Sequence, residues 1–342
     1  MVELVSSPPA ISRKPQRVMV LGASGTIGQA TVAALVQRGH DVVCILRPHH
    51  AAGGRPEAKP HTSRFPGATL RFCDVTNASA LANDGFYGEK FDAVISCLAS
   101  RTGAPKEAWA IDDQANTVAL AQARKAGITH MVVLSAICVQ KPLLAFQHAK
   151  LAFEKKLIES GITYSIVRPT AFFKSLSGQI ERVKKGKPFL VFGDGTLTSC
   201  KPISDADLGA YLADCLDDES RANRVLPIGG PGPAITPKQQ GEKLFALLGR
   251  EPKFKHVPVA LLDTIIWTLA LTGRVAPRLA DKAELARIGR YYATESMLVL
   301  DPATGRYDAD ATPSTGSELL FDFYARVIKG EAVVERGDHA VF

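Results

Sequence analysis

The sequence of 342 residues has no CxxC pair and no apolar stretch of the about 20 residues that a membrane-spanning helix needs. The six cysteines are Cys44, Cys73, Cys97, Cys138, Cys200 and Cys215. Several lie in apolar runs, so we expect reduced, buried side chains and neither a structural zinc site nor an iron–sulfur cluster. The nearest approach to a membrane span is Val257–Leu271, which carries Asp263 in its middle. We predict a buried helix or a lid there, with contact to a membrane interface as the alternative.

The chain also lacks a dense run of lysine and arginine with interleaved aromatic side chains, although its formal net charge is +7. Scattered positive charge argues against nucleic-acid binding and suits an anionic small ligand or an anionic membrane surface. Met1–Gln16 is polar and has no apolar core, which predicts a disordered tail over residues 1–16 and no secretory signal. We therefore expect a cytoplasmic protein and leave peripheral membrane contact and the oligomeric state open.

What the first half does contain is a regular alternation of short apolar strands and helical segments. The expected strands are Val18–Leu21, Asp41–Leu46, Thr69–Cys73, Ala93–Leu98, Met131–Ser135 and Tyr164–Arg168, and the expected helices are Thr26–Arg38, Ala108–Ala126 and Leu143–Ser160. This alternation predicts an α/β fold, with a Rossmann-type doubly wound parallel sheet covered on both faces. We assign residues 17–185 to the domain that contains this sheet and binds a ligand at its edge. Residues 186–342 form a smaller α+β substrate-binding region that is partly interleaved with the first domain.

A glycine turn, Gly22-Ala23-Ser24-Gly25-Thr26-Ile27-Gly28, follows directly on the first strand. Glycines let the backbone approach a pyrophosphate, and the start of the following helix offers it unpaired N–H groups. The spacing is GxxGxxG, and a purely structural turn is the alternative. The predicted coenzyme contacts in this turn are Gly22, Ser24, Gly25, Thr26, Ile27 and Gly28.

Arg47 ends the second strand, about 20 residues after the turn, where an NAD-preferring site places a carboxylate for the ribose. A guanidinium suits a 2′-phosphate, so we expect NADPH, with a solvated surface arginine as the alternative. The loop Pro48–Pro66 that follows is expected to be flexible. Ligands bind beyond the carboxyl ends of parallel strands, which adds Asp74, Val75, Cys97, Leu98 and Ala99. Asp74 is alternatively a loop or cap residue, and Cys97 a core residue.

The glycine turn together with Ser135 and Lys150 resembles a short-chain dehydrogenase/reductase. Enzymes of that family carry a serine and then a Tyr-xxx-Lys on the next helix, and the resemblance implies that Lys150 binds the nicotinamide ribose. The tyrosine position is Phe146, which has no proton to give. The chain is therefore similar to the atypical, NmrA-like branch. A lysine on the helix surface is the alternative for Lys150.

Longer blocks are similar to the NADPH-dependent divinyl chlorophyllide 8-vinyl-reductases of chlorophyll and bacteriochlorophyll biosynthesis. The blocks are Ser96–Gly103, Leu134–Leu143, Tyr164–Leu176, Val225–Gly232, Leu248–Phe254 and Gly289–Met297, within a match from about Arg17 to about Lys329. The resemblance implies reduction of the 8-vinyl group of a divinyl (proto)chlorophyllide to ethyl by hydride from NADPH. Magnesium then belongs to the tetrapyrrole substrate, and we expect no metal of the protein's own. In the third block, Pro169 and Thr170 are assigned to the coenzyme.

The substrate would be a flat apolar ring with an acidic periphery. Phe172 and Phe173 offer apolar area, and Arg168, Lys174 or Arg290 could meet a propionate. Lys150, Tyr291 and Tyr292 are the candidate catalytic residues, the tyrosines as proton donors. Two other functions stay open. One is an NADPH reductase of another conjugated double bond, and the other is an NmrA-like redox sensor that binds NADP(H) without catalysis. The sensor is an alternative because Phe146 stands at the tyrosine position.

Overall fold

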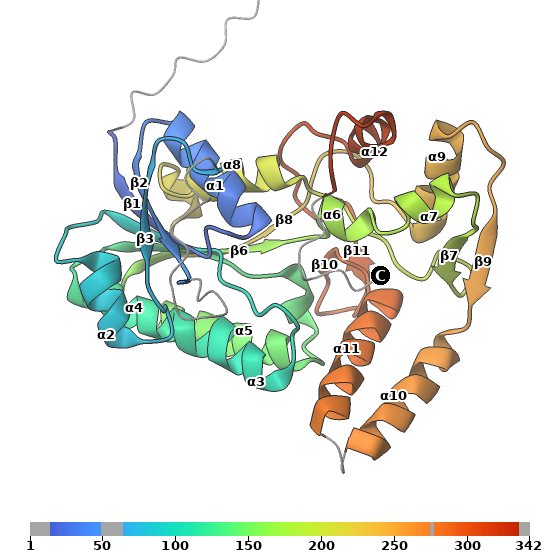
Figure 1. Cartoon of the computed structure of the whole chain (residues 1–342), viewed down its shortest axis with the longest axis horizontal. Coiled ribbons are helices and arrows are strands. Elements are labelled where there is room, and N and C mark those ends of the chain that lie inside the picture. Colours follow the sequence, from blue (N-terminus) through green and yellow to red (C-terminus); the bar gives the residue numbers. More distant parts are fainter. Residues whose placement is uncertain (1–13, 49–63, 274–276, 335–342) are drawn as a thin grey trace, which may run out of the picture.

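The computed structural model describes residues 14–48, 64–273 and 277–334. Most of the predicted tail and of the Pro48–Pro66 loop therefore lies outside the described residues. The centre is a seven-stranded sheet of order β3-β2-β1-β4-β5-β6-β8 in which every neighbouring pair is parallel (Figure 1). Its strands are β1 (Arg17–Leu21), β2 (Asp41–Leu46), β3 (Ala68–Phe72), β4 (Ala93–Ser96), β5 (His130–Leu134), β6 (Thr163–Pro169) and β8 (Arg224–Ile228). The strand order reverses between β1 and β4, which is where α/β sheets bind ligands.

Both faces of the sheet are covered, which explains why its central strands are continuously apolar. Val18 and Val20 point into one core cluster beneath α1 (Thr26–Gln37) and α8 (Asp205–Asp214), and Met19 and Leu21 point into the other. The second face carries α2 (Ala78–Ala80), α3 (Pro105–Ala108), α4 (Asn116–Lys125) and α5 (Ala145–Ile158) (Figure 1). The predicted Rossmann-type fold is confirmed, and all six cysteines are buried and free as expected.

One predicted helix is interrupted. In place of a single helix over Ala108–Ala126, the chain forms α3, then a π-helix η3 (Trp109–Ala115), then α4. The other short helical turns are η2 (Leu81–Phe86), η4 (Ile137–Gln140) and η5 (Glu219–Arg221). Periodicity alone could not show the interruption, because a π-helix changes the turn by one residue without changing the composition.

The second half contributes both to the sheet and to a separate region. Strand β8 and helix α8 come from beyond residue 185 and complete the sheet domain. The remaining strands form two small pairs, β7 (Phe189–Phe192) with β9 (Phe254–Val257) and β10 (Val299–Leu300) with β11 (Tyr307–Asp308). The remaining helices are α6 (Phe173–Leu176), α7 (Ile180–Lys184), α9 (Pro237–Leu247), α10 (Val259–Gly273), α11 (Pro277–Thr294) and α12 (Leu320–Lys329).

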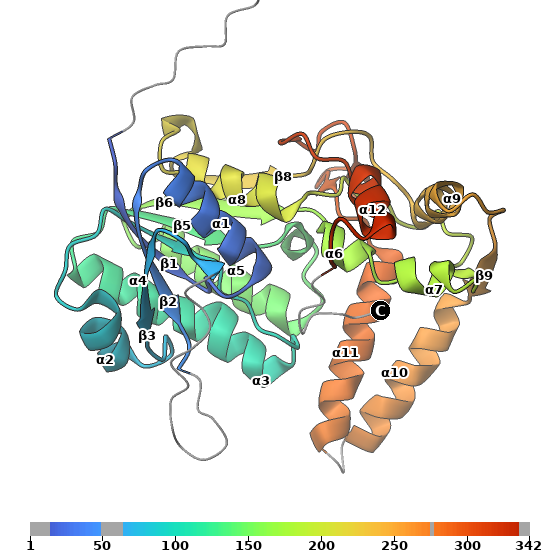
Figure 2. The same cartoon turned by 45° about the horizontal axis from the view of Figure 1, so that its top comes forward.

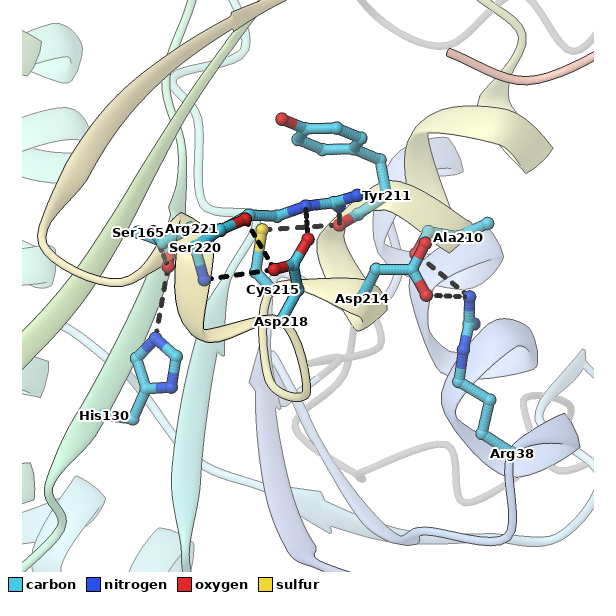
Figure 3. Close-up of polar contacts among 10 residues, drawn as sticks. All are labelled: Arg38, His130, Ser165, Ala210, Tyr211, Asp214, Cys215, Asp218, Ser220 and Arg221. Carbon is cyan, nitrogen blue, oxygen red and sulfur yellow. Dashed lines mark hydrogen bonds and ion pairs between the residues drawn. The ribbon is translucent and has the colours of Figure 1, made fainter. Parts of the chain in front are cut away.

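Polar contacts fasten α8 to α1 and the turn after α8 to the sheet (Figure 3). Arg38, at the end of α1, pairs with Asp214 of α8 at 2.7 Å. The Arg221 guanidinium lies 4.0 Å from the centroid of the Tyr211 ring, and the Arg221 carbonyl accepts from Ser165 Oγ at 2.9 Å. Ser165 lies near the amino end of β6, away from the edge that carries the glycine turn, so we assign this cluster a structural role.

Helices α10 and α11 lie side by side and extend from the C-terminal region (Figures 1 and 2). The prediction of a buried helix near Val257–Leu271 is wrong: no side chain described in α10 is buried, and Leu261, Trp267 and Leu271 are 51%, 67% and 49% exposed. The reason is that α10 packs against α11 on one side only. No helix in the described part of the chain is both long and apolar enough to span a bilayer.

Candidate active site

The glycine turn lies at the reversal of strand order, directly beside the chain that leaves β4. Cys97 N donates to the Leu21 carbonyl at 2.9 Å. Gly22 has a φ of 70°, and a Cβ on it would lie 2.6 Å from the carbonyl carbon of Cys97. A Cβ on Gly28 would lie 2.2 Å from the Gly22 carbonyl oxygen. Close packing within the protein therefore requires glycine at both positions.

Gly25 is different, because nothing in the protein requires its lack of a side chain. It caps α1 with φ −70° and ψ 160°, which other residues adopt, and a Cβ there would meet the Gly22 carbonyl oxygen at an ordinary 3.4 Å. No side chain caps this helix end, and its first turn carries no acidic residue. A helix N-terminus in this state attracts an anion. The turn fits the diphosphate of a dinucleotide, with Gly25 at the approach.

Lys174 points to this turn. The sequence analysis assigned it to a substrate propionate, but its ammonium donates a hydrogen bond to the hydroxyl of Thr26, the first residue of α1. Helix α6 follows directly on β6 and so brings this cation to the glycine turn, while the expected contact with a propionate stays a prediction. A positive charge here would complement an anionic diphosphate.

Arg47 and Asp74 approach one another at the ends of β2 and β3. Both are exposed. Donation from the hydroxyl and backbone N–H of Thr76, at 2.7 and 2.9 Å, holds the pKa of Asp74 below its usual range, and the charge of Arg47 adds to this effect. Asp74 thus shapes a loop turn, while Val75 packs on the core of that face. Among the described residues, an exposed cation and an exposed anion therefore lie where β2 and β3 end.

The chain after β4 supplies backbone more than reactive side chains. Cys97 is 8% exposed, and its Sγ lies 3.8 Å from the Thr31 hydroxyl. Burial raises the pKa of the Cys97 thiol to about 12, so it stays neutral at physiological pH. Leu98 packs on the core, and Ala99 is exposed beside it. The Cys97 side chain is part of the core, as in the alternative interpretation. Its backbone lies directly against Gly22.

Lys150 faces the same edge from α5, and Phe146 lies one turn before it. The Gln147 side chain accepts from Leu144 N at 2.9 Å and so fixes where α5 begins. Phe146 is half-buried in a cluster with residues of α11. The Lys150 ammonium lies 2.9 Å from Oδ1 of Asp112, and the two side chains are 11% and 0% exposed. Lys150 is therefore a largely buried member of an ion pair, which does not match the alternative of a solvated surface lysine.

The hydroxyl of Ser135 donates its hydrogen bond to another residue of the protein. It donates to Oε1 of Glu154, and Glu154 in turn pairs through both oxygens with the guanidinium of Arg168. Glu154 and Ser135 are 3% and 5% exposed. Arg168 therefore neutralises a buried carboxylate, and the substrate contact expected of it loses its support. The role of Ser135 toward the coenzyme stays a prediction.

The two candidate tyrosines have different surroundings. Tyr291 is 3% exposed and its hydroxyl donates to the carbonyls of Cys138 and Lys141, at 2.9 and 3.1 Å, while burial raises its pKa. Tyr292 is 37% exposed, and its hydroxyl lies 4.0 Å from Cys138 Sγ. Tyr291 serves to hold α11 against η4. Burial of its hydroxyl and the nearby Cys138 raise the pKa of Tyr292 well above its usual value, and its role as a proton donor stays a prediction.

Several residues expected to contact the substrate make contacts within the protein in this structure. Phe173 is 3% exposed in a core cluster of the C-terminal region, with its ring 5.6 Å from that of Phe323, so it lacks a free face for a pigment. Phe172 is half-buried against the sheet core. Arg290 pairs with Asp263 and thereby joins α11 to α10. Thr170, which the sequence assigns with Pro169 to the coenzyme, donates to the Lys201 carbonyl, and its coenzyme role stays a prediction.

The sequence reasoning missed the carboxylates that organise this edge, above all Asp112 and Glu154. Both lie at helix positions whose neighbours three or four residues away are buried, such as Asn116 for Asp112 and Leu157 for Glu154. A charged residue on the buried face of a predicted helix indicates a buried carboxylate, and a buried carboxylate requires a partner. This pattern could have identified both residues.

The parallel sheet, its reversal point and the glycine turn define a nicotinamide-nucleotide-binding protein of Rossmann type. A family model described as NAD(P)H-binding matches residues 22–219. The NADPH-dependent quinone oxidoreductase of Escherichia coli in complex with NADPH is structurally similar, with a TM-score of 0.64 at 18% identity over 91% of this chain and 99% of that one.

Relatives that are much more similar in sequence come from plants. The divinyl chlorophyllide a 8-vinyl-reductase of Oryza sativa subsp. indica is 50% identical over 95% of this chain and 82% of its own length. That of Cucumis sativus is 50% identical over 96% of this chain and 80% of its own. The chain belongs to the divinyl chlorophyllide a 8-vinyl-reductase family.

Proposed function

We propose that the protein reduces the 8-vinyl group of a divinyl chlorophyllide or protochlorophyllide to ethyl, with NADPH as the reductant. The observation that carries the proposal is the combination of 50% identity to reductases of that name with a glycine turn whose Gly25 is left open to a ligand. When bound, the reduced nicotinamide supplies a hydride. A vinyl group conjugated to a tetrapyrrole can accept it because the macrocycle delocalises the charge that results.

The reaction asks the protein for placement more than for a strong acid. Good orientation of two reactants supplies a large part of a rate enhancement, so the loss of the family tyrosine at Phe146 is tolerable. Lys150 would hold the nicotinamide ribose from α5. Tyr292 is the proposed proton donor, since its hydroxyl lies beside Cys138 and its ring is partly exposed.

We assign the coenzyme as NADPH on the strength of Arg47. The guanidinium stands exposed at the end of β2, where a ribose 2′-phosphate would lie. Asp74 remains ionised beside it but is engaged by Thr76. The buried, reduced cysteines fit a reducing compartment, and we propose the cytoplasm.

The direct test is to incubate the purified protein with NADPH and divinyl chlorophyllide. We expect a blue shift of the Soret band and a product two hydrogen atoms heavier by mass spectrometry. The Lys150→Met variant is the control for coenzyme placement. A protein that binds NADPH and leaves the vinyl group unreduced would instead support the redox-sensor alternative.

We also propose peripheral membrane contact through α10. Its exposed residues Leu261, Ile265, Trp267 and Leu271 form an apolar surface, and β9 just before it carries exposed Lys255. Exposed apolar residues next to basic ones suit an anionic bilayer surface. Sedimentation with vesicles of anionic lipid should carry down the parent protein and much less of Trp267→Ser. Equal recovery of both proteins in the supernatant would remove the proposal.

A further inference from the structure

We propose that Asp112 is the positioning residue for Lys150: its buried carboxylate fixes the lysine ammonium at the coenzyme edge. The inference rests on the proposed use of Lys150 in coenzyme binding. In this chain Lys150 lacks the tyrosine that accompanies it in related enzymes, because that position is Phe146. Asp112 is the partner that the structure provides.

The distances and burial support a fixed pair. Lys150 Nζ lies 2.9 Å from Asp112 Oδ1, and the carboxylate is fully buried while the lysine is 11% exposed. An unpaired charge is costly to bury, so each member of such a pair requires the other. No donor in the described part of the chain meets Oδ1 in hydrogen-bond alignment, which makes the contact with Lys150 electrostatic. A flexible lysine is thereby held near one position on α5.

The π-helix η3 places the carboxylate. Asp112 and Asp113 are consecutive, and yet both reach lysines of α5, Asp113 pairing with Lys156 at 2.6 Å. Neighbouring side chains of a regular α-helix point about 100° apart, so a local change of turn helps both to face the same helix. π-helical turns occur often at functional sites.

Asp112 also holds the other side of the site. Its Oδ2 accepts a hydrogen bond from Ser100 N at 3.3 Å, in the chain that leaves β4 and runs past Gly22. One buried carboxylate therefore joins the strand-end loop to Lys150. Both elements lie at the carboxyl edge of the sheet, where the nicotinamide half of a dinucleotide is expected.

The charge balance around Lys150 depends on Asp112. Two further titratable groups of the described residues, the thiols of Cys97 and Cys138, interact with the lysine charge. Burial raises the pKa of both thiols, that of Cys97 to about 12, so both are neutral near pH 7. Phe146 adds no charge. Removing the Asp112 carboxylate would therefore leave a mostly buried ammonium without the anion that holds it in place.

The test compares Asp112→Asn with Asp113→Asn. Both variants remove a buried carboxylate from the same π-helix, but Asp113 pairs with Lys156, which is 43% exposed. NADPH binding is followed by fluorescence, and thermal unfolding checks the fold. We expect Asp112→Asn to raise the Kd about tenfold, and Asp113→Asn to stay within about twofold.

Equal Kd values for the two variants would overturn the proposal. If Asp112→Asn folds poorly, the double variant Asp112→Asn/Lys150→Met is compared with Lys150→Met alone. Equal coenzyme binding by these two would support the coupling, and a further loss in the double variant would overturn it. A parent protein that binds NADPH but leaves the pigment unreduced would overturn only the proposed reaction, because the Asp112 comparison is read in coenzyme binding.

Discussion

Lys174 donates a hydrogen bond to the hydroxyl of Thr26, although the two residues are 148 positions apart in the sequence. Thr26 begins α1, and Lys174 lies in α6, the short helix that follows β6. The contact brings a cation from the segment after β6 to the turn that is shaped for a diphosphate. Two segments far apart in the sequence thus meet at the proposed coenzyme site.

Replacing Lys174 by Met should weaken NADPH binding about tenfold, because one charge-assisted contact to the diphosphate would be lost. Titration of the coenzyme fluorescence measures the Kd. The matched control is Lys184→Met, since Lys184 pairs with Glu181 on the neighbouring α7. An unchanged Kd for Lys174→Met, together with a higher KM for pigment, would instead assign Lys174 to substrate binding.

Alanine at Gly25 and at Gly28 should have opposite effects. Gly28→Ala places a Cβ 2.2 Å from a backbone oxygen, so we expect a lower melting temperature and a poor yield of folded protein. Gly25→Ala should melt like the parent protein and lose coenzyme affinity, because its added methyl group would occupy the approach of the diphosphate. Circular dichroism and NADPH titration separate the two effects. Normal NADPH binding by Gly25→Ala would show that the diphosphate lies elsewhere.

Arg47→Ala should raise the KM for NADPH by more than about tenfold and leave that for NADH almost unchanged, since only NADPH carries the 2′-phosphate. Steady-state kinetics with each coenzyme and one pigment concentration provide the comparison. Equal changes for the two coenzymes would contradict the assignment of Arg47 to the phosphate.

The two tyrosines of α11 should separate stability from chemistry. Tyr291→Phe removes the hydroxyl donor of the Lys141 carbonyl and one of the three donors to the Cys138 carbonyl, so the free energy of unfolding should fall by about 1–3 kcal/mol while folded protein stays active. Tyr292→Phe should keep the stability and slow the single-turnover rate. Denaturant unfolding and stopped-flow absorbance give the two measurements. A full rate in Tyr292→Phe would exclude its hydroxyl as the proton donor.

The central sheet could be predicted because its signals are local. Each of the six expected strands is a short apolar run that forms near its predicted bounds, and the glycine turn lies between β1 and α1 as expected. The π-helix η3 and the exposure of α10 could not be predicted in this way. The first depends on how η3 meets α5, and the second on α10 having a neighbour on one side only.

The amino-acid sequence by itself determined the Rossmann-type sheet, the turn for the diphosphate and the family resemblance, because each depends on a pattern of residues close together in the sequence. Only the tertiary structure decided which cation meets which anion. Arg168 pairs with Glu154, Lys150 pairs with Asp112, and Lys174 donates a hydrogen bond to Thr26. Such pairs join distant parts of the chain, and a buried charge takes the partner that packing brings within reach, whatever its position in the sequence.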